Sequence, residues 1–342
     1  MNDKNNTKRF RRGSGAITLH DVAKLAGVAP ITASRAVNTP DLVSPEVLKK
    51  VLDAVHRTGY VPNRIAGGLA SSRSRLIAAV VPSTVMSVFM ETIESLNGTL
   101  FDAGYQLMLG QSGYSAARED LLLEAVIGRR PDGIFLTGIL PPGKSRTRLL
   151  ASGIPVVETW DLTPTPIDML VGFSHSDIGR DVANFLMTKG RKRLALVRAD
   201  DERADRRATA FSDAVVLRGQ QDVFVVNIGD SRSLKSGREA MVRILKEAPD
   251  VDAIFCSSDL LALGVMTEAR AQGIAVPDRI AIVGFGDVPF LADLVPALST
   301  VRINGADIGR QSARFLIERA EGRSVNPCVV DVGFSIAERD TT

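Results

Sequence analysis

The 342-residue sequence predicts an α/β protein, with a small helical head at its N-terminus and two doubly wound parallel sheets in the rest of the chain. Residues 18–58 contain three short helical patterns separated by turn signals. From residue 76 onward, continuous apolar runs alternate with amphipathic stretches of helical length, which is typical of parallel sheets covered on both faces. Residues 1–75 hold 13 Lys and Arg against 5 Asp and Glu, whereas the remainder holds 29 against 34. A basic head on an acidic body is typical of a DNA-binding module joined to a sensor.

The composition argues against several other classes of protein. No run of about 18 apolar residues is free of charge, so we expect no membrane contact. The N-terminus is basic at residues 8–12 and lacks the apolar core of a secretory signal, so we expect a cytoplasmic protein. Cys256 and Cys328 stand alone in apolar runs and are expected to be isolated thiols. The histidines have no Cys or His partner at ligand spacing, so we expect no metal, no cofactor and no His-based triad.

The first two helices of the head are predicted from their end signals. Thr18 and Asp21 have the spacing of a capping box, and the apolar residues of 19–26 fall on one helical face. Gly27 can adopt the left-handed conformation that ends a helix. A second helix is expected from Pro30, a residue favoured at the first helical position.

A third helix is predicted from the Ser44-Pro45 start signal to about Thr58, where Gly59 stops it. Its apolar stripe closes a three-helix core. A helix, a tight glycine turn and a second helix with polar outward residues form the helix-turn-helix arrangement.

The segments DVAKLAGV, TASRAVN, VSPEVLKKV and GYVPNRIAGGLA make the head specific. In motif order and spacing, residues 18–72 closely resemble the head and hinge of the LacI family of repressors. The resemblance implies a homodimer that binds palindromic double-stranded operator DNA. It also implies a basic flexible tail at 1–16, a helix-turn-helix head at 17–62, a hinge helix and linker at 63–74, and a two-lobed effector-binding and dimerisation domain at 75–342.

The resemblance also implies which residues of the head contact DNA. Arg35 can place two donors on a guanine, a contact worth about 1–3 kcal/mol of discrimination. Pro30 and Ile31 would read thymine methyls or DNA shape, although Ile31 could instead pack inside the head. Ala29 stands where most members have Ser, which removes a helix cap worth about 1 kcal/mol. The expected contacts are Thr18, Pro30, Ile31, Thr32, Ser34, Arg35 and Asn38.

The hinge is the second expected DNA element. Asn63, Arg64 and Leu69 match a short helix that family dimers place in the minor groove, with Leu69 wedged between base pairs. Gly67 and Gly68 weaken this helix by about 1 kcal/mol each relative to alanine, so it is expected to fold only on DNA. Alternatively the segment is a passive tether, in which case Leu69 has no role.

The body is expected to form two lobes. Its strand-like runs are 76–82, 105–111, 132–138, 154–160, 193–199, 223–229, 252–258 and 280–286. The segments VGFSHSDIGRDVANFLMTKGRKRLALV, CSSDLLALG and VPDRIAIVGFGDVPF resemble the family's sensor domain. That domain is similar to periplasmic sugar-binding proteins, which hold their ligand between lobes.

Effector contacts are expected at the carboxyl ends of the strands, where ligands bind to open α/β sheets. The resemblance places an effector-contacting arginine at Arg207 and a hydroxyl-accepting aspartate at Asp259, chemistry suited to a carboxylate and to vicinal hydroxyls. Each has an alternative, Arg207 on a solvated helix face and Asp259 as a helix N-cap. Trp160 could stack on a sugar or belong to the lobe core. The candidate residues are Ser83, Thr84, Phe89, Glu158, Trp160, His175, Arg207 and Asp259.

The effector itself is expected to be a sugar acid. GYQLMLGQSGYS, IPVVETWDLTPTPIDMLVGFSH and residues 330–334 resemble the gluconate-operon repressors of the family, which implies gluconate or a derivative as an inducer. The alternative is a sugar-acid-modifying enzyme with a regulatory DNA-binding head. The body lacks a GxxxxGK[ST] loop and a GxGxxG after its first strand, so we expect no enzyme. A transport-linked binding protein would need the signal peptide that the N-terminus lacks.

Overall fold

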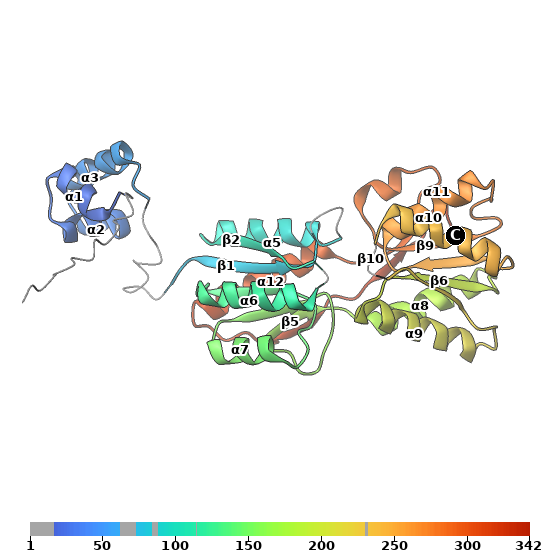
Figure 1. The fold of residues 1–342 in the computed structure, drawn as a ribbon. Coiled ribbons are helices and arrows are strands. Elements are labelled where there is room, and N and C mark those ends of the chain that lie inside the picture. The colour runs from blue at the N-terminus through green and yellow to red at the C-terminus, as the bar shows by residue number, and fades with distance from the viewer. Residues whose placement is uncertain (1–16, 62–72, 84–87, 114, 230–231) are drawn as a thin grey trace, which may run out of the picture. The chain divides into compact units, whose positions relative to one another are not determined.

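The computed structural model describes residues 17–61, 73–83, 88–113, 115–229 and 232–342 (Figure 1). The chain divides into two compact units, Met1–Ser74 and Arg75–Thr342. Four residues with expected roles, Asn63, Arg64, Leu69 and Thr84, lie outside the described residues.

The head consists of three helices and a short 3-10 turn: α1 (Leu19–Ala26), α2 (Pro30–Asn38), η1 (Pro40–Leu42) and α3 (Pro45–Thr58). The capping box is confirmed, because the Thr18 N–H donates to Asp21 Oδ2 at 2.8 Å and the Asp21 N–H donates to Thr18 Oγ1 at 3.4 Å. Gly27 ends α1 with a φ of 68°. Ala29 leaves α2 without a side-chain cap. The apolar core is Val22, Ala23, Ala33, Ala36, Val51 and Ala54.

The second unit contains two sheets, as predicted, and each has six strands, two more than the apolar runs indicated. Lobe 1 is the sheet in the order β11-β5-β4-β3-β1-β2 and lobe 2 the sheet in the order β12-β10-β9-β8-β6-β7, with the helices packed on each. Every pairing is parallel except that between β10 and β12. The strands of lobe 1 are β1 (Leu76–Val81), β2 (Gln106–Gln111), β3 (Gly133–Thr137), β4 (Val156–Thr159), β5 (Met169–Gly172) and β11 (Val329–Asp331). Those of lobe 2 are β6 (Leu194–Arg198), β7 (Phe224–Asn227), β8 (Ala253–Cys256), β9 (Ala281–Gly286), β10 (Ser299–Arg302) and β12 (Ser335–Ala337).

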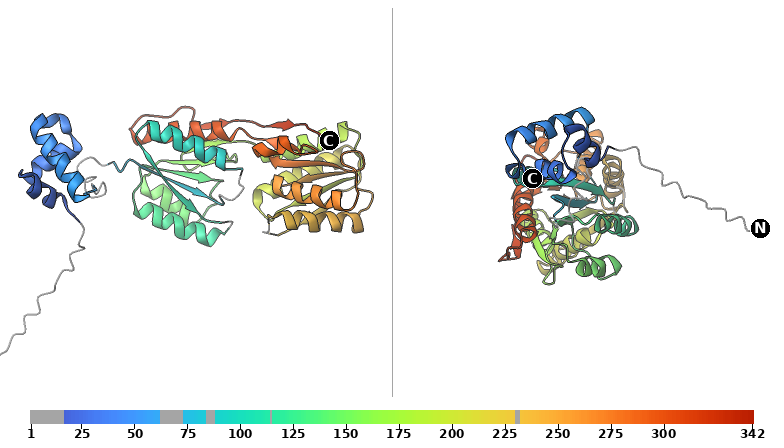
Figure 2. Two further views of the ribbon diagram at one scale, coloured as in Figure 1. Left: turned by 90° about the horizontal axis from the view of Figure 1, so that it is seen from above. Right: turned by 90° about the vertical axis from the view of Figure 1, so that its left-hand side faces the viewer.

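Helices cover both faces of each sheet (Figure 2). In lobe 1, α5 (Met90–Asp102) packs against α12 (Gly305–Ala320), and α6 (Ala116–Gly128) packs against α7 (Lys144–Ser152). In lobe 2, α8 (His175–Thr188) packs against α9 (Glu202–Leu217) on one face, and α10 (Leu234–Glu247) packs against α11 (Asp259–Ala271) on the other. The turn η2 (Pro289–Asp293) follows β9. The continuous apolar strands are therefore buried on both faces, which explains why the sequence shows no polar alternation in them.

The chain passes between the lobes three times, after β5, after β10 and after β11. The first crossing leads directly from the end of β5 through Phe173, which is fully buried, into α8. Loops at the carboxyl ends of lobe 1 strands therefore lie next to the first turns of α8 and α9 in lobe 2. This boundary contains most of the expected effector residues.

Candidate functional site

The outward face of α2 carries the residues expected to read DNA. Pro30, Ile31 and Arg35 are exposed, whereas Ala33 and Ala36 are buried in the head core. The alternative that Ile31 packs inside the head is wrong, because 61% of this residue is exposed. The exposed face therefore combines an apolar side chain with a charged fork, a pair that can distinguish thymine from guanine in the major groove.

Two other residues of α2, Ser34 and Asn38, form hydrogen bonds with each other. Asn38 Nδ2 donates to the Ser34 carbonyl at 3.0 Å and lies 3.3 Å from the Ser34 hydroxyl. Thr32 is half-buried beside them, and Thr18 is exposed at the start of α1. The predicted roles of these four residues in DNA contact stay predictions.

In the sensor, an aromatic cluster forms the base of the boundary between the lobes. Trp160 follows β4 with a φ of 63°, so the predicted strand at 154–160 ends one residue early. Its ring packs edge-on against Phe89 at 4.9 Å and against Phe173 at 5.6 Å between ring centroids. Trp160 is 2% exposed, which favours the core alternative, yet its indole Nε1 has no partner among the described residues.

His175, the first residue of α8, connects this cluster to Arg207. Its Nε2 lies 3.0 Å from the Trp160 carbonyl and its Nδ1 lies 2.8 Å from Arg207 Nη1. Because the carbonyl can only accept and the guanidinium can only donate, the ring is the neutral tautomer with its proton on Nε2. Burial lowers the pKa of His175 well below its usual value, and the nearby Arg207 and Arg203 lower it further. His175 therefore holds Arg207 without adding a charge.

Arg207 lies at the centre of the candidate site. It is 5% exposed, so the solvated-face alternative is wrong. Its guanidinium stacks over the Phe285 ring at 4.1 Å and Nη2 lies 3.4 Å from the Ser257 carbonyl. Burial lowers its pKa to about 10, so it remains charged at neutral pH. Arg206 and Arg232 pair with aspartates, but in the part of the chain that the structure describes, no carboxylate forms an ion pair with Arg207, and its Nε has no partner.

Asp259, the first residue of α11, is 3% exposed. The alternative role of helix N-cap belongs instead to Ser258, whose side chain accepts from the Leu261 N–H. The Asp259 carboxylate accepts from Thr300 Oγ1 at 2.5 Å and from the Val288 N–H at 3.2 Å. A Cβ at position 284 would lie 2.4 Å from Asp259 Oδ1, so Gly284 provides the space for this carboxylate. Burial raises the pKa of Asp259 to about 6.

Glu158 is not brought to this cluster. Its carboxylate accepts from the Leu140 N–H at 2.9 Å and the Ile167 N–H at 2.7 Å, and it pairs with Arg146 at 3.5 Å. Side chains alternate along a strand, and this position of β4 faces the core beneath α6 and α7. Glu158 therefore holds the loops that follow β3 and β4. Ser83 follows β1 and is half-buried.

Two contacts across the boundary involve Arg203, Arg206 and Asp161, which were not among the expected site residues. The Arg203 guanidinium lies 5.9 Å from the centroid of the Phe89 ring, and Arg206 forms an ion pair with Asp161, which is 2% exposed. Together with Arg207, these arginines occupy positions i, i+3 and i+4 of α9. That spacing puts all three on one side of the helix, a signal that was present in the sequence.

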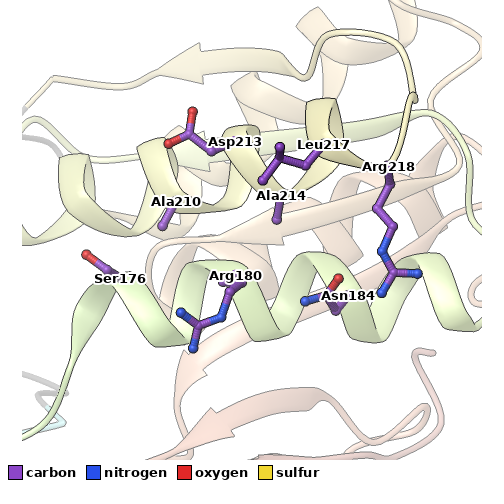
Figure 3. Close-up of a pocket in the computed structure, with 8 residues that line it drawn as sticks. All are labelled: Ser176, Arg180, Asn184, Ala210, Asp213, Ala214, Leu217 and Arg218. Carbon is purple, nitrogen blue, oxygen red and sulfur yellow. The ribbon is translucent and has the colours of Figure 1, made fainter.

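A separate surface groove of about 450 Å³ runs between α8 and α9 (Figure 3). Arg180 and Asn184 from α8 and Asp213 and Leu217 from α9 are among the residues that line it. None of its lining side chains is both buried and unpaired within the described residues. The groove contains none of the expected effector residues, and the buried boundary around Arg207 remains the better candidate site.

The fold and the site define a class of protein, a helix-turn-helix transcriptional regulator with a ligand-binding sensor. The family profile "Bacterial regulatory proteins, lacI family" matches residues 18–63, and the "Periplasmic binding protein-like domain" profile matches residues 183–342. The HTH-type transcriptional regulator GntR of Pseudomonas aeruginosa is 36% identical over 100% of this chain and 98% of its own length. The chain therefore belongs to the LacI family of transcriptional regulators.

Solved structures agree with this assignment. A LacI-family transcriptional regulator from Silicibacter pomeroyi matches with a TM-score of 0.89 and 32% identity, over 95% of this chain and 99% of that one. The transcription regulator GntR from Chromobacterium violaceum matches with a TM-score of 0.73 and 34% identity, over 78% and 98%. The relatives are regulators and not enzymes, as predicted. Among the described residues, no helix has the length and apolar character needed to cross a membrane.

Proposed function

We propose that this chain is a homodimeric repressor that binds a palindromic operator and releases it when a sugar acid, gluconate or a derivative, occupies the boundary between the lobes. The observation that carries the sugar-acid assignment is Arg207, a buried guanidinium with no carboxylate partner among the described residues. A buried charge is costly unless it is paired, and a ligand carboxylate would provide a bidentate partner. The resemblance to gluconate-operon repressors and the relatives named GntR support the same class of effector.

Asp259 supports the polyhydroxy part of the ligand. With a pKa of about 6, its carboxylate is ionised at neutral pH and can accept hydrogen bonds from vicinal hydroxyls. Its side chain already accepts from Thr300 and Val288, which fix its orientation. An acid-binding arginine and a hydroxyl-binding aspartate in one lobe suit an aldonate better than a neutral sugar or a purine.

The DNA half of the proposal rests on α2. Arg35 and Ile31 are the exposed reading residues of each head, and two heads would read half-sites about one helical turn apart. Thr18, Thr32, Ser34 and Asn38 are proposed to contact the backbone or flank the reading face. Asn63, Arg64 and Leu69 are proposed to contact the minor groove.

The test is operator binding by the full-length protein at one stated salt concentration, with and without gluconate. We expect gluconate to weaken the complex, whereas ribose and guanine leave it unchanged. Arg207→Gln should abolish the response to gluconate, because it removes the guanidinium that has no carboxylate partner among the described residues. Arg218→Gln, which removes an exposed arginine just beyond α9, should respond like the wild type.

The outcomes separate the parts of the proposal. If the protein binds its palindrome but ignores gluconate, the effector assignment is wrong while the regulator stands. If Arg207→Gln still responds fully, the placement of the carboxylate is wrong. An absence of specific DNA binding under every condition would contradict the proposed repressor as a whole.

A further inference from the structure

One helix of lobe 2 makes direct contacts with lobe 1. Arg203 and Arg206, both within the first two turns of α9, contact Phe89 and Asp161 of lobe 1. The next residue, Arg207, is the one proposed to bind the effector carboxylate. The helix that carries the proposed ligand-binding residue therefore also carries the contacts with the other lobe.

Asp161 is held rigidly within lobe 1. A Cβ at position 172 would lie 1.9 Å from the Asp161 carbonyl oxygen, so Gly172 of β5 allows the backbone of Asp161 to lie directly against the strand. Its Oδ1 accepts from the Leu162 N–H at 2.8 Å. Because its backbone lies against β5, Asp161 moves with lobe 1 and not with α9 if the lobes move.

Leaving the carboxylate of Asp161 without a cationic partner would cost free energy. Asp161 is 2% exposed, and burial raises its pKa while Arg206 opposes that rise. A buried carboxylate that loses its cation keeps the full cost of desolvation. The arrangement of the lobes that forms the pair is therefore favoured over one that separates it.

The residue before Asp161 is tied to lobe 2 as well. The Trp160 carbonyl accepts from His175 Nε2, and α8 is packed tightly on α9, since a Cβ at Gly179 would lie 2.1 Å from the Arg207 carbonyl oxygen. Lobe 1 thus presents two consecutive residues to lobe 2, and their partners lie beside Arg207 in sequence or in space. A displacement of Arg207 on ligand binding must pass to both contacts.

We propose that the Asp161–Arg206 pair is an interlobe lock, which sets the balance between two arrangements of the lobes and couples effector binding to operator affinity. This inference rests on the proposed function in one respect, that an effector beside Arg207 rearranges the lobes. A ligand shifts such a balance only by its difference in affinity for the two arrangements, and a side-chain contact present in one arrangement shifts it in the same way.

The test uses four full-length variants, Arg206→Gln, Asp161→Asn, the double variant and Arg206→Lys, with Arg218→Gln as the matched control. In ligand-free protein, we expect the first three to change operator affinity in one direction, by a factor within the range of about 5 to 150 that is typical of allosteric coupling. The double variant should change operator affinity in the same direction as Arg206→Gln but by less, because it leaves no unpaired buried carboxylate. Arg206→Lys and Arg218→Gln should stay close to the wild type.

The same variants are then titrated with gluconate. If the pair sets a balance in which operator and effector favour opposite arrangements, each variant that breaks the pair changes gluconate affinity in the direction opposite to its change in operator affinity. Trp160 is the only tryptophan of the chain, so its emission should change in these variants and not in Arg218→Gln. If the unpaired Asp161 prevents Arg206→Gln from folding, the double variant is used in its place, because it removes both charges and leaves no unpaired carboxylate.

An operator affinity of Arg206→Gln equal to that of the wild type overturns the lock. A loss of gluconate binding with unchanged operator affinity also overturns it, since Arg206 would then be only a ligand contact. A wild type that ignores gluconate contradicts the proposed effector instead, while the ligand-free operator affinities still decide whether the lock exists.

Discussion

At the scale of single residues, the site combines two buried ionisable groups of opposite character. Arg207 is a desolvated cation without a carboxylate partner among the described residues, and Asp259 is a carboxylate whose pKa burial raises to about 6. Neither arrangement favours stability, because burying a charge costs free energy unless a partner offsets it. Such groups are typical of ligand-binding sites, where the ligand supplies the missing partner.

Asp259 makes stability depend on pH in a defined direction. Its folded pKa lies above the unfolded value of 3.8, so the folded state binds the proton more tightly and the stabilising effect of protonation is lost as the pH rises through about 6. The free energy of unfolding of the wild type relative to Asp259→Asn should therefore fall by about 1 kcal/mol between about pH 5 and about pH 7.5. Chemical denaturation of both proteins across that range is the measurement.

A difference between the two proteins that does not vary with pH would contradict the raised pKa. Thr300→Val is not a suitable comparison for this experiment, because Thr300 donates to the same carboxylate at 2.5 Å and the loss of that hydrogen bond would itself raise the pKa of Asp259. The negative charge of Asp287 adds to the rise in the pKa of Asp259. Asp287→Asn should therefore lower the pKa of Asp259 and reduce the change in the free energy of unfolding between about pH 5 and about pH 7.5.

At the scale of elements, the pair α8 and α9 determines where the functional side chains lie. His175 begins α8 and Arg207 lies in the second turn of α9, so the distance between these helices fixes the hydrogen bond of 2.8 Å between the two residues. The close approach is possible because Gly179 of α8 has no side chain facing the Arg207 backbone. A larger residue at this position must push the helices apart.

Gly179→Ala should therefore destabilise the protein by roughly 1–3 kcal/mol, as expected for overpacking, and weaken effector binding. The matched control is Gly98→Ala in α5, where the new Cβ meets nothing within 4 Å and the gain in helix propensity should stabilise by about 0.5–1 kcal/mol. Thermal unfolding with and without gluconate measures both effects. If Gly179→Ala is as stable as Gly98→Ala, the proposed close contact between α8 and α9 at this position is wrong.

At the scale of the whole molecule, charge is divided between the two units. The first 75 residues carry a clear excess of Lys and Arg, and the remainder carries an excess of Asp and Glu. The head is therefore suited to the DNA backbone, and the acidic sensor is repelled by it. This division should reduce non-specific contacts between sensor and DNA.

Operator affinity should accordingly be strongly salt-dependent. A dimer that neutralises several phosphates with its two heads should lose about 10³–10⁵ in affinity between about 50 mM and about 200 mM salt, because bound counterions are released. Gluconate affinity should change far less over the same range, since a buried ion pair is poorly screened. Titrations of operator and gluconate at matched salt concentrations check this, and equal salt dependence of the two would contradict it.

Much of the fold could be predicted because it depends on neighbouring residues. The capping box at Thr18, the turn at Gly27 and the start of α2 at Pro30 involve residues three to four apart or single backbone conformations. The eight predicted strand runs contain β1 to β4 and β6 to β9, whereas β5, β10, β11 and β12 were not predicted; each of these four is only three or four residues long. Several predicted runs extend one or two residues past the strand ends, and at the end of β4 the extra residue is Trp160, which has a left-handed backbone and packs against Phe89 and Phe173.

The site was determined partly by the sequence and partly by the tertiary structure. The motifs of the head and sensor were sufficient to predict a LacI-family regulator, and the positions of Arg207 and Asp259 after their strands were sufficient to choose them as candidate effector contacts. Only the tertiary structure decided that Glu158 faces away from the site, that His175 is neutral and that Arg206 pairs with Asp161. These properties depend on burial and on partners such as Asp161, 45 residues before Arg206, and no local pattern encodes a contact across that distance.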